Sequence, residues 1–399
     1  MKKSVKDIDI KGKKVIMRVD FNVPLDKETN TKITDTTRVD AAMDTINYIL
    51  SQGASLILMS HLGRPDGTPN PKYSLKPVYE YLKTKLPNNK VEFAPDCIGD
   101  TVKSMASSLN AGDVLLLENL RYHAEEEKND PNFCKELASL ADVYVNDAFG
   151  TAHRAHASTA GIVSAKTGMP AVAGFLMEKE IKYLGEAVAN PERPFVAIIG
   201  GAKVSSKISV LENLITKVDT LIVVGGMAYT FFKAKGVSVG TSLCEDDYVA
   251  TAQKIMDKAK ELGKTLFLPI DNVVADKFDN EANRKTVSWN EIPDGWMGMD
   301  VGEKTIAELE GILKNAKTVI WNGPLGVFEM SNFSKGTFEV AKMIANSGAI
   351  SIIGGGDSVS AVNKSGVADK MSHVSTGGGA SLEFLEGIEL PGIKVLEDK

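Results

Sequence analysis

The stretch Gly354-Gly355-Gly356-Asp357-Ser358 decides the fold prediction, because it directly follows the apolar run Ala349-Ile350-Ser351-Ile352-Ile353. A short apolar run that stops at glycines is typical of a buried strand that ends in a tight turn. Consecutive glycines let backbone N–H groups approach a ligand, and such groups suit phosphate where a helix begins next. Asp357 would then hold a divalent cation that bridges phosphate oxygens. A plain strand-to-helix turn with a capping acid fits equally well, so the other strand ends must decide.

Further apolar runs in the second half of the chain end in a similar way, most of them in glycine. They are residues 195–199, 221–224, 266–268, 319–321 and 373–375. Gly377-Gly378-Gly379 offers a second helix N-terminus that can hold anionic charge. Lys203 and Lys207 follow the Gly-Gly turn at 200–201, and their spacing predicts one face of a starting helix aimed at a polyphosphate. A solvated helix face is the alternative interpretation of this pair.

The first half of the chain alternates short apolar runs with helical patterns. Strands are predicted at 15–19, 55–59, 114–117 and 143–145, and helices at 36–52, 75–86 and 131–140. Continuous apolar strands separated by helices indicate a parallel sheet that is covered on both faces. Ligands of such sheets gather at the carboxyl ends of the strands.

Polar and basic side chains stand at these strand ends in the first half. They are Asp20, Asn22, His61, Arg64 and Arg121, with Arg38 at the start of the first helix and Arg154 just beyond the fourth strand. Guanidinium groups that converge on one edge of an acidic protein predict a small polyanion carrying phosphate or carboxylate. For any single arginine, a surface ion pair is the alternative. His61 is predicted to contact substrate because it stands beside Arg64, whereas His153 and His156 are interpreted as supporting residues.

The length of 399 residues favours two or three domains. A long helical pattern at 175–190 is interpreted as a connector between a first domain at 1–174 and a second at 191–386. The sequence therefore predicts two doubly wound, parallel-sheet α/β domains of the Rossmann-like kind, which face each other across a cleft and are joined by a long helix.

Composition excludes several classes of function. The formal net charge is −6, which argues against general nucleic-acid binding. The 3 cysteines form no CxxC pair, so neither a disulfide framework nor a zinc site is indicated. No signal peptide or membrane span is recognisable, which predicts a cytoplasmic protein without a membrane partner. The motifs GxxxxGK[ST], GxGxxG and HExxH are missing, which argues against a P-loop NTPase and a dinucleotide oxidoreductase.

Several longer motifs carry a resemblance to one family. In the first half they are RVDFNVP at 18–24, SHLGRP at 60–65, ENLR at 118–121 and NDAFGTAHRAH at 146–156. In the second half they are GGAKV at 200–204, WNGPLGVFE at 321–329, GGGDS at 354–358 and HVSTGGGA at 373–380. The chain closely resembles phosphoglycerate kinase of the bacterial type, and the motifs follow the family order over essentially the whole length.

The resemblance implies reversible phosphoryl transfer between 1,3-bisphosphoglycerate and ADP, giving 3-phosphoglycerate and ATP with Mg²⁺. The protein is further expected to be a monomer whose two domains close by hinge bending. It assigns substrate binding to Asp20, Phe21, Asn22, Arg38, His61, Leu62, Gly63, Arg64, Arg121 and Arg154. It assigns nucleotide binding to Lys203, Lys207, Gly298, Asn322, Glu329 (at the ribose), Gly355, Gly356, Asp357 (also the metal ligand) and Ser358. Arg38, Lys203 and Gly378 are the expected catalytic residues, and residues 387–399 are expected to pack back on the first domain.

Two alternatives from other classes stand beside this interpretation. A non-catalytic nucleotide-binding regulator of the same fold would be favoured by loss of Lys203, Arg38 or Asp357, and all three are present. An NAD-dependent enzyme would need the GxGxxG loop that the sequence lacks.

Overall fold

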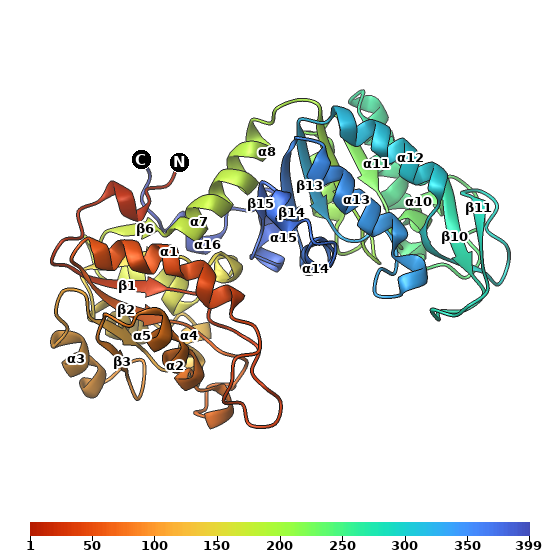
Figure 1. Cartoon of the computed structure of the whole chain (residues 1–399). Helices are drawn as coiled ribbons and strands as arrows, with labels where there is room; N and C mark the ends of the chain where they lie inside the picture. Colours follow the sequence, from red (N-terminus) through yellow and green to blue (C-terminus); the bar gives the residue numbers. More distant parts are fainter. The chain divides into compact units, whose positions relative to one another are not determined.

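A computed structural model of the chain describes residues 1–399, apart from the side chains of Glu186 and Ala187. The chain forms two compact units: unit 1 comprises Met1–Glu180 and Glu389–Lys399, and unit 2 comprises Ile181–Ile388 (Figure 1). The helical stretch predicted at 175–190 consists of α7 (Phe175–Glu180), the π-helix η6 (Ile181–Glu186) and α8 (Ala187–Ala189). The boundary between the units therefore falls inside this stretch.

Unit 1 is built on a six-stranded sheet with the strand order β3-β4-β2-β1-β5-β6, in which every pairing is parallel. Its strands are β1 (Lys14–Arg18), β2 (Ser55–Met59), β3 (Val91–Phe93), β4 (Val114–Leu116), β5 (Val143–Asn146) and β6 (Ala171–Ala173). Arg18 is in register with both Met59 and Asn146, so the carboxyl ends of three adjacent strands are level. Loops that leave this edge consequently start close together.

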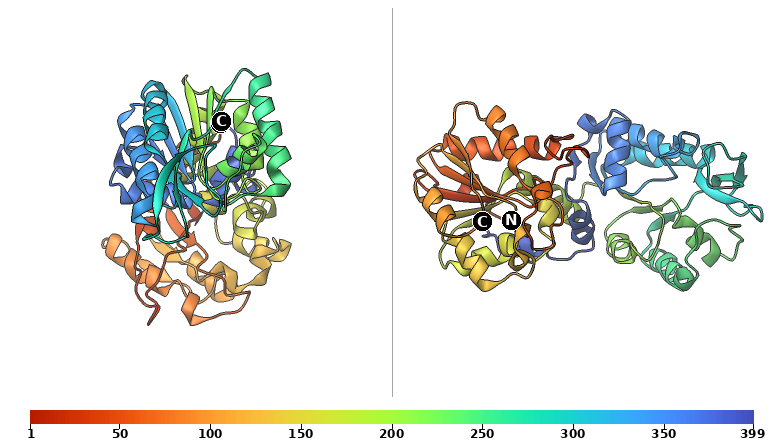
Figure 2. Two further views of the ribbon diagram at one scale, coloured as in Figure 1. Left: turned by 90° about the vertical axis from the view of Figure 1, so that its right-hand side faces the viewer. Right: turned by 90° about the horizontal axis from the view of Figure 1, so that it is seen from below.

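Helices cover both faces of this sheet (Figure 2). They are α1 (Thr37–Ser51), α2 (Lys76–Lys85), α3 (Asp100–Ser107), α4 (Ala124–Glu127), α5 (Pro131–Ala138), α6 (Ile162–Ala165), α7 and α16 (Pro391–Lys394), with the short turns η1 (Val5–Asp7), η2 (Pro71–Tyr73), η3 (Leu120–Tyr122), η4 (Phe149–Thr151) and the π-helix η5 (Ala157–Gly161). In α1, Val39, Ile46 and Ile49 are fully buried at helical spacing. Burial of each such side chain contributes about 1.5–3 kcal/mol, which fixes the helix on the sheet.

The C-terminal segment Glu389–Lys399 belongs to unit 1 and binds both the start of the chain and the end of β5. Lys3 N–H donates to the carbonyl of Glu397 over 2.8 Å, and the Asn146 side-chain amide donates to the carbonyl of Gly392 over 3.0 Å. Both termini therefore lie on the same unit, as their labels in Figure 1 show.

Unit 2 repeats the architecture with a parallel sheet of order β15-β14-β13-β7-β8-β9. The strands are β7 (Phe195–Ile199), β8 (Thr220–Val223), β9 (Thr265–Phe267), β13 (Thr318–Asn322), β14 (Ile350–Gly354) and β15 (His373–Val374). Each lies where an apolar run predicts it, because strands covered on both faces are apolar throughout. The predicted α/β class with two parallel sheets is confirmed.

Helices also cover both faces of the second sheet. Figure 2 shows green helices, among them α10 and α11, on one face and cyan and blue helices, among them α12 and α13, on the other. The helical elements are α9 (Ile208–Ile215), α10 (Ala228–Ala234), α11 (Val249–Glu261), α12 (Glu303–Asn315), α13 (Lys335–Asn346), α14 (Gly356–Lys364) and α15 (Gly379–Leu385), with the turns η7 (Asp246–Tyr248), η8 (Ser331–Phe333) and η9 (Ala368–Lys370).

A small antiparallel sheet in unit 2 was not predicted from the sequence. It consists of β11 (Arg284–Ser288), β10 (Asp271–Ala275) and β12 (Met297–Val301), in that order. The strand β11 reads RKTVS and is largely exposed, so it carries no apolar run. Strand β12 contains Gly298, one of the residues that the sequence predicts to bind nucleotide.

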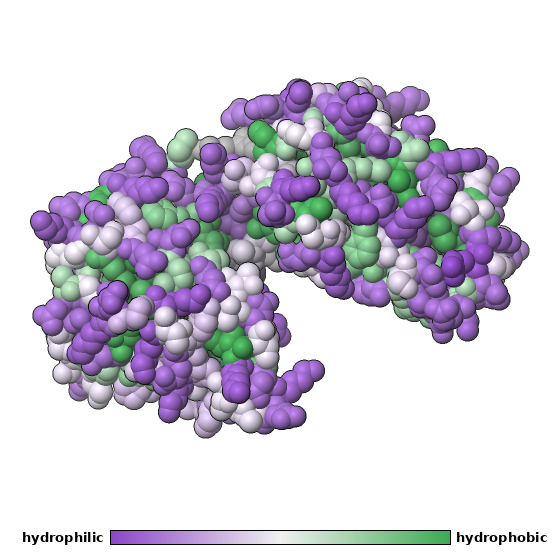
Figure 3. Space-filling model, in the orientation of Figure 1, coloured by the Kyte–Doolittle hydropathy of each residue, from purple (hydrophilic) through white to green (hydrophobic). Residues whose placement is uncertain are grey.

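Hydrophilic residues cover most of the face shown in Figure 3, and hydrophobic residues appear there as scattered patches. Among the described residues, no helix combines the length and the apolar character needed to cross a membrane.

Candidate active site

A basic face forms at the carboxyl edge of the sheet in unit 1; we use this name for Asp20, Asn22, Arg38, His61, Arg64, Arg121 and Arg154. Arg38, on the first turn of α1, reaches the loop that follows β1. Its Nη1 donates to Asp20 Oδ2 over 3.0 Å and to the carbonyl of Asn22 over 3.1 Å. The Asn22 side-chain oxygen accepts from Gly63 N–H over 2.9 Å. Arg38 is thus oriented while nearly half of its side chain, 43%, stays exposed to a ligand.

Arg121 enters the same face from η3. Asn119 fixes this turn, because its side-chain oxygen accepts from Arg121 N–H over 3.0 Å and its amide donates to the carbonyl of Leu62 over 2.7 Å. The guanidinium donates to the carbonyl of Gly63 over 3.1 Å and lies 3.5 Å from a carboxylate oxygen of Glu127. Burial, offset in part by Glu127, lowers the pKa of Arg121 below its ordinary value of 12.5. A ligand anion would relieve this cost.

A buried hydrogen-bond network, which was not predicted from the sequence, holds His61 in place. Arg18, at the end of β1, is fully buried; its Nη2 lies 3.1 Å from His61 Nδ1 and its Nε donates to Ser158 Oγ over 2.9 Å. Ser158 in turn donates to the buried Glu126. The signal in the sequence was the arginine that ends an otherwise apolar strand.

This network sets the protonation of His61. Burial, followed by the charges of Arg18 and Arg121, lowers the pKa of His61 well below its ordinary value of 6.5. Because a guanidinium can only donate, Nδ1 accepts and the neutral ring carries its proton on Nε2. The same causes lower the pKa of His156 to about 4. The positive charge of the basic face therefore comes from arginines at neutral pH.

The remaining predicted substrate residues differ in exposure. Arg64 and Arg154 are exposed, and Arg154 Nε donates to His153 Nε2 over 3.0 Å. Phe21 and Leu62, by contrast, are buried in the core, and their N–H groups already donate to Ser60 Oγ and to the Asn119 side chain. They support the loops of the basic face from inside.

In unit 2, a cavity of about 450 Å³ opens beside the carboxyl ends of the strands. Gly201 and Gly225 line it from loops after β7 and β8, and Gly298 lines it from β12. The carboxylates of Glu329 and Asp357 also face it. The cavity therefore gathers three predicted nucleotide residues, Gly298, Glu329 and Asp357, from segments far apart in the sequence.

A second group of predicted residues surrounds the end of β13. The ammonium of Lys207 donates a hydrogen bond to Asn322 Oδ1, whereas the buried Nδ2 of Asn322 has no hydrogen-bond partner among the described residues. A Cβ on Gly355 would lie only 3.0 Å from that Nδ2, so the glycine leaves room beside an unsatisfied donor. Buried donors without partners are costly, and a ligand oxygen would satisfy this one. Burial lowers the pKa of Lys207 to about 8 although the charge of Asp357 opposes this.

The predicted helical face for Lys203 and Lys207 is wrong. Helix α9 begins only at Ile208, and Lys207 is its N-cap residue. Glu245 accepts from both the N–H and the hydroxyl of Ser205, over 2.9 and 2.6 Å, which draws this segment out of helical geometry. Lys203 is instead an exposed loop residue.

The glycines at the strand ends of unit 2 serve two purposes. A Cβ on Gly200 would lie 2.2 Å from the carbonyl oxygen of Pro324, so this glycine is needed for packing of the loops. A Cβ on Gly356 or Gly378 would meet no atom of the described residues within 4 Å, so these two glycines face open space. Gly378 has φ = +50° before α15, a conformation that favours glycine.

Ser358 lies in the first turn of α14 and is fully buried. Its Oγ accepts from Gly323 N–H over 2.5 Å, which ties α14 to the loop after β13. The hydroxyl therefore holds the start of α14 and the loop after β13 together inside the protein.

Comparisons with known proteins identify the family of this chain. The profile of the family described as "Phosphoglycerate kinase" matches residues 5–388. A relative with that name from Leptospira biflexa serovar Patoc is 56% identical over 391 residues, covering 98% of this chain and 97% of the relative. Another with that name, from Chloroherpeton thalassium, is 56% identical over 400 residues, covering 100% and 99%. A solved structure titled as phosphoglycerate kinase from Coxiella burnetii has a TM-score of 0.91 at 41% identity, covering 99% of this chain and 98% of that one.

Two parallel-sheet units, one with a basic face and one with a glycine-rich cavity, define an α/β phosphotransferase. The chain belongs to the phosphoglycerate kinase family. It is a glycolytic kinase that transfers phosphate to the carboxyl group of 3-phosphoglycerate. The non-catalytic alternative is not favoured by these comparisons.

Proposed function

We propose that the two units divide the ligands of this reaction between them. The basic face of unit 1 binds 3-phosphoglycerate or 1,3-bisphosphoglycerate, and the cavity of unit 2 with the end of β13 binds ATP or ADP with Mg²⁺. The observation that carries the proposal is the contrast between the two edges. Guanidinium groups gather around a neutral histidine in unit 1, whereas in unit 2 an unsatisfied amide donor and two carboxylates lie at glycine-rich loops.

The substrate side follows from charge and geometry. A phosphate and a carboxylate both accept two parallel N–H bonds from a guanidinium, which favours Arg38, Arg64, Arg121 and Arg154 as their partners. His61, neutral with its proton on Nε2, adds a directed donor without adding charge. Asp20 keeps Arg38 in place before the ligand arrives, because the two side chains are 3.0 Å apart.

The nucleotide side follows from the donors and the metal chemistry. The residues present fit Mg²⁺, because the exposed carboxylate of Asp357 lies at the cavity and Mg²⁺ prefers carboxylate together with phosphate oxygens. Bound there, Mg²⁺ would neutralise phosphate charge. The free N–H of Asn322 and the ammonium of Lys207 would donate to phosphate oxygens, and Glu329 would accept from the ribose hydroxyls.

The chemical step needs positioning and charge neutralisation rather than a general base. An oxygen of the β-phosphate of ADP, already ionised, attacks the phosphorus of the acyl phosphate, and the bond from phosphorus to the acyl oxygen breaks to release a carboxylate. Arg38, Lys203 and the N–H groups beside Gly378 stabilise the charge on the transferred group. Both ligands are required at once, so both units must reach the phosphoryl group in the working complex.

An activity assay tests the proposal directly. The full chain is incubated with ATP, Mg²⁺ and 3-phosphoglycerate, and formation of ADP and acyl phosphate is followed. Activity that requires all three components, and that falls in Arg121→Gln but not in the surface control Lys342→Gln, is the expected result. Transfer to water alone, or activity that is independent of 3-phosphoglycerate, would contradict the proposed division of ligands.

A further inference from the structure

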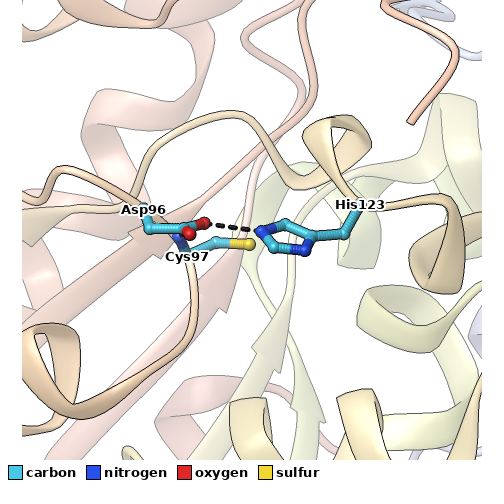
Figure 4. A group of neighbouring side chains, drawn as sticks. All are labelled: Asp96, Cys97 and His123. Carbon is cyan, nitrogen blue, oxygen red and sulfur yellow. Dashed lines mark hydrogen bonds and ion pairs between the residues drawn. The ribbon is translucent and has the colours of Figure 1, made fainter. Parts of the chain in front are cut away.

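A cluster of three potential metal ligands lies in unit 1, apart from the residues of the basic face. Asp96 and Cys97 stand in the loop between β3 and α3, and His123 stands between η3 and α4. One ligand atom from each residue, a carboxylate oxygen, the thiol sulfur and an imidazole nitrogen, lie within 4.8 Å of one another. Figure 4 shows the three side chains pointing toward one another from the two loops.

The shell around the cluster orients two of its ligands. The Asp96 carboxylate accepts from the N–H of Cys97 over 2.6 Å and lies 2.7 Å from His123 Nε2. The imidazole packs on Phe133, with ring centroids 5.5 Å apart. Groups that are held in place before a metal arrives lose less entropy on binding, and such outer contacts tune metal sites.

One of the three potential ligands is buried, and the other two are partly exposed to solvent. Cys97 is completely buried, whereas the side chains of Asp96 and His123 are 44% and 25% exposed. An ion can therefore arrive from solvent past the carboxylate and the imidazole and meet the sulfur at the bottom. The fourth coordination position would then face solvent.

The charges near the cluster favour a cation. Residues 125–127, which begin directly after Ala124 in α4, are three consecutive glutamates. The negative charge of Glu125 interacts electrostatically with His123, and that of Glu126 interacts electrostatically with Cys97. An imidazole, a carboxylate and a thiolate would together neutralise a divalent ion.

We propose that Asp96, Cys97 and His123 form a binding site for a borderline-soft divalent cation of the Zn²⁺ class. Oxygen, nitrogen and sulfur together match the ligands that zinc takes, whereas Mg²⁺ and Ca²⁺ prefer oxygen alone. Zinc bonds of about 2.0–2.3 Å in tetrahedral geometry require the Asp96 oxygen and His123 Nε2 to separate by somewhat more than half an ångström. Both side chains are partly exposed, so a small rotation suffices.

The site would join two loops that have no covalent link. His123 lies two residues after Arg121 of the basic face, so the ion would clamp the turn that presents this arginine. The sequence did not indicate a zinc site, because Cys97 and His123 are far apart in the chain and no CxxC pair exists. The proposal does not depend on the division of ligands between the two units.

Zinc titration of the full chain, free of nucleotide and Mg²⁺, tests the proposal. A chromophoric chelator competes for the ion, and the matched variants are Cys97→Ser, His123→Gln and Asp96→Asn, with Cys244→Ser as a control that removes a thiol elsewhere. Loss of even an outer partner weakens metal sites about 10–100-fold, so each ligand variant should bind at least about tenfold more weakly than the wild type. The control should bind one ion as the wild type does.

Co²⁺ supplies a second readout that identifies the ligand. A sulfur-to-cobalt charge-transfer band should appear with the wild type and with Cys244→Ser and vanish with Cys97→Ser. Substitution of the buried Cys97 also disturbs packing, so the variants of the partly exposed residues, His123→Gln and Asp96→Asn, decide the question independently. No binding by the wild type, or binding of equal strength in all variants, would overturn the proposal.

Discussion

Replacement of Lys207 by methionine should change how the stability of unit 2 depends on pH. The ammonium of Lys207 is partly buried and donates to Asn322, and burial lowers its pKa from 10.5 to about 8. Between these two values the unfolded chain binds a proton that the folded chain does not bind. Stability in this interval therefore rises with pH, and the methionine variant lacks this contribution.

The size of the effect follows from the pKa difference. A pKa shift of one unit corresponds to about 1.4 kcal/mol. Keeping Lys207 charged in the folded state at neutral pH therefore lowers the free energy of unfolding by about 3 kcal/mol. Titration of a group with these two pKa values raises the free energy of unfolding by about 2 kcal/mol between pH 7 and pH 9.5. A polyphosphate that pairs with the ammonium would recover part of this cost.

The assay is urea unfolding followed by tryptophan fluorescence at several pH values. All 3 tryptophans, Trp289, Trp296 and Trp321, lie in unit 2, so the signal reports on that unit alone. Subtracting the pH profile of Lys207→Met from that of the wild type cancels the other titrating groups. Lys203→Met, at an exposed loop residue, is the matched control and should keep the wild-type profile.

A difference profile that is flat from pH 7 to pH 9.5 would refute this reasoning. So would an equal rise in the Lys203→Met difference profile, because the effect would then come from charge in general. Nucleotide binding gives an independent check: Lys207→Met should bind ADP more weakly at pH 7, where the wild-type ammonium is charged.

Three further substitutions test individual roles. Lys203→Ala should lower kcat by about 10²–10³-fold, the usual loss for one electrostatic contact to a transition state, and near-normal turnover would exclude that role. Arg38→Lys should lose most activity in steady-state assays because an ammonium cannot reproduce the planar fork; if activity survives, Arg38 acts only as a surface charge. Asp357→Asn should raise the Mg²⁺ concentration for half-maximal activity, whereas an unchanged magnesium titration argues against direct ligation.

The fold was largely predictable because the strands of both parallel sheets are covered on two faces. Such strands are short apolar runs, and the stretch ending at Gly354 shows this directly. The antiparallel sheet escaped prediction because polar residues interrupt its strands and because β11 is also largely exposed. The start of α9 was misplaced because Glu245, forty residues away from Ser205, holds that segment in a turn.

The candidate site was predictable where function places polar residues at strand ends. His61 and Arg121 stand out in the sequence because each follows an apolar strand, and Arg38 because it stands at the start of the first helix. The buried support beneath His61 was not predictable, because the contact between Arg18 and Ser158 spans 140 residues. Similarly, the unsatisfied Nδ2 of Asn322 becomes visible only when its surroundings are known.

The division of ligands between the two units is tested most directly by calorimetric titration with each ligand alone. Arg64→Gln removes an exposed guanidinium of the basic face, and Glu329→Gln removes a carboxylate at the cavity of unit 2. A hydrogen bond to a charged group contributes about 1.5–3 kcal/mol, so each variant should lower the affinity for one ligand about 10–100-fold. Arg64→Gln should weaken the binding of 3-phosphoglycerate and leave the binding of ADP unchanged. Glu329→Gln should weaken the binding of ADP and leave the binding of 3-phosphoglycerate unchanged. Weakening of the other ligand, or of both equally, would contradict the account.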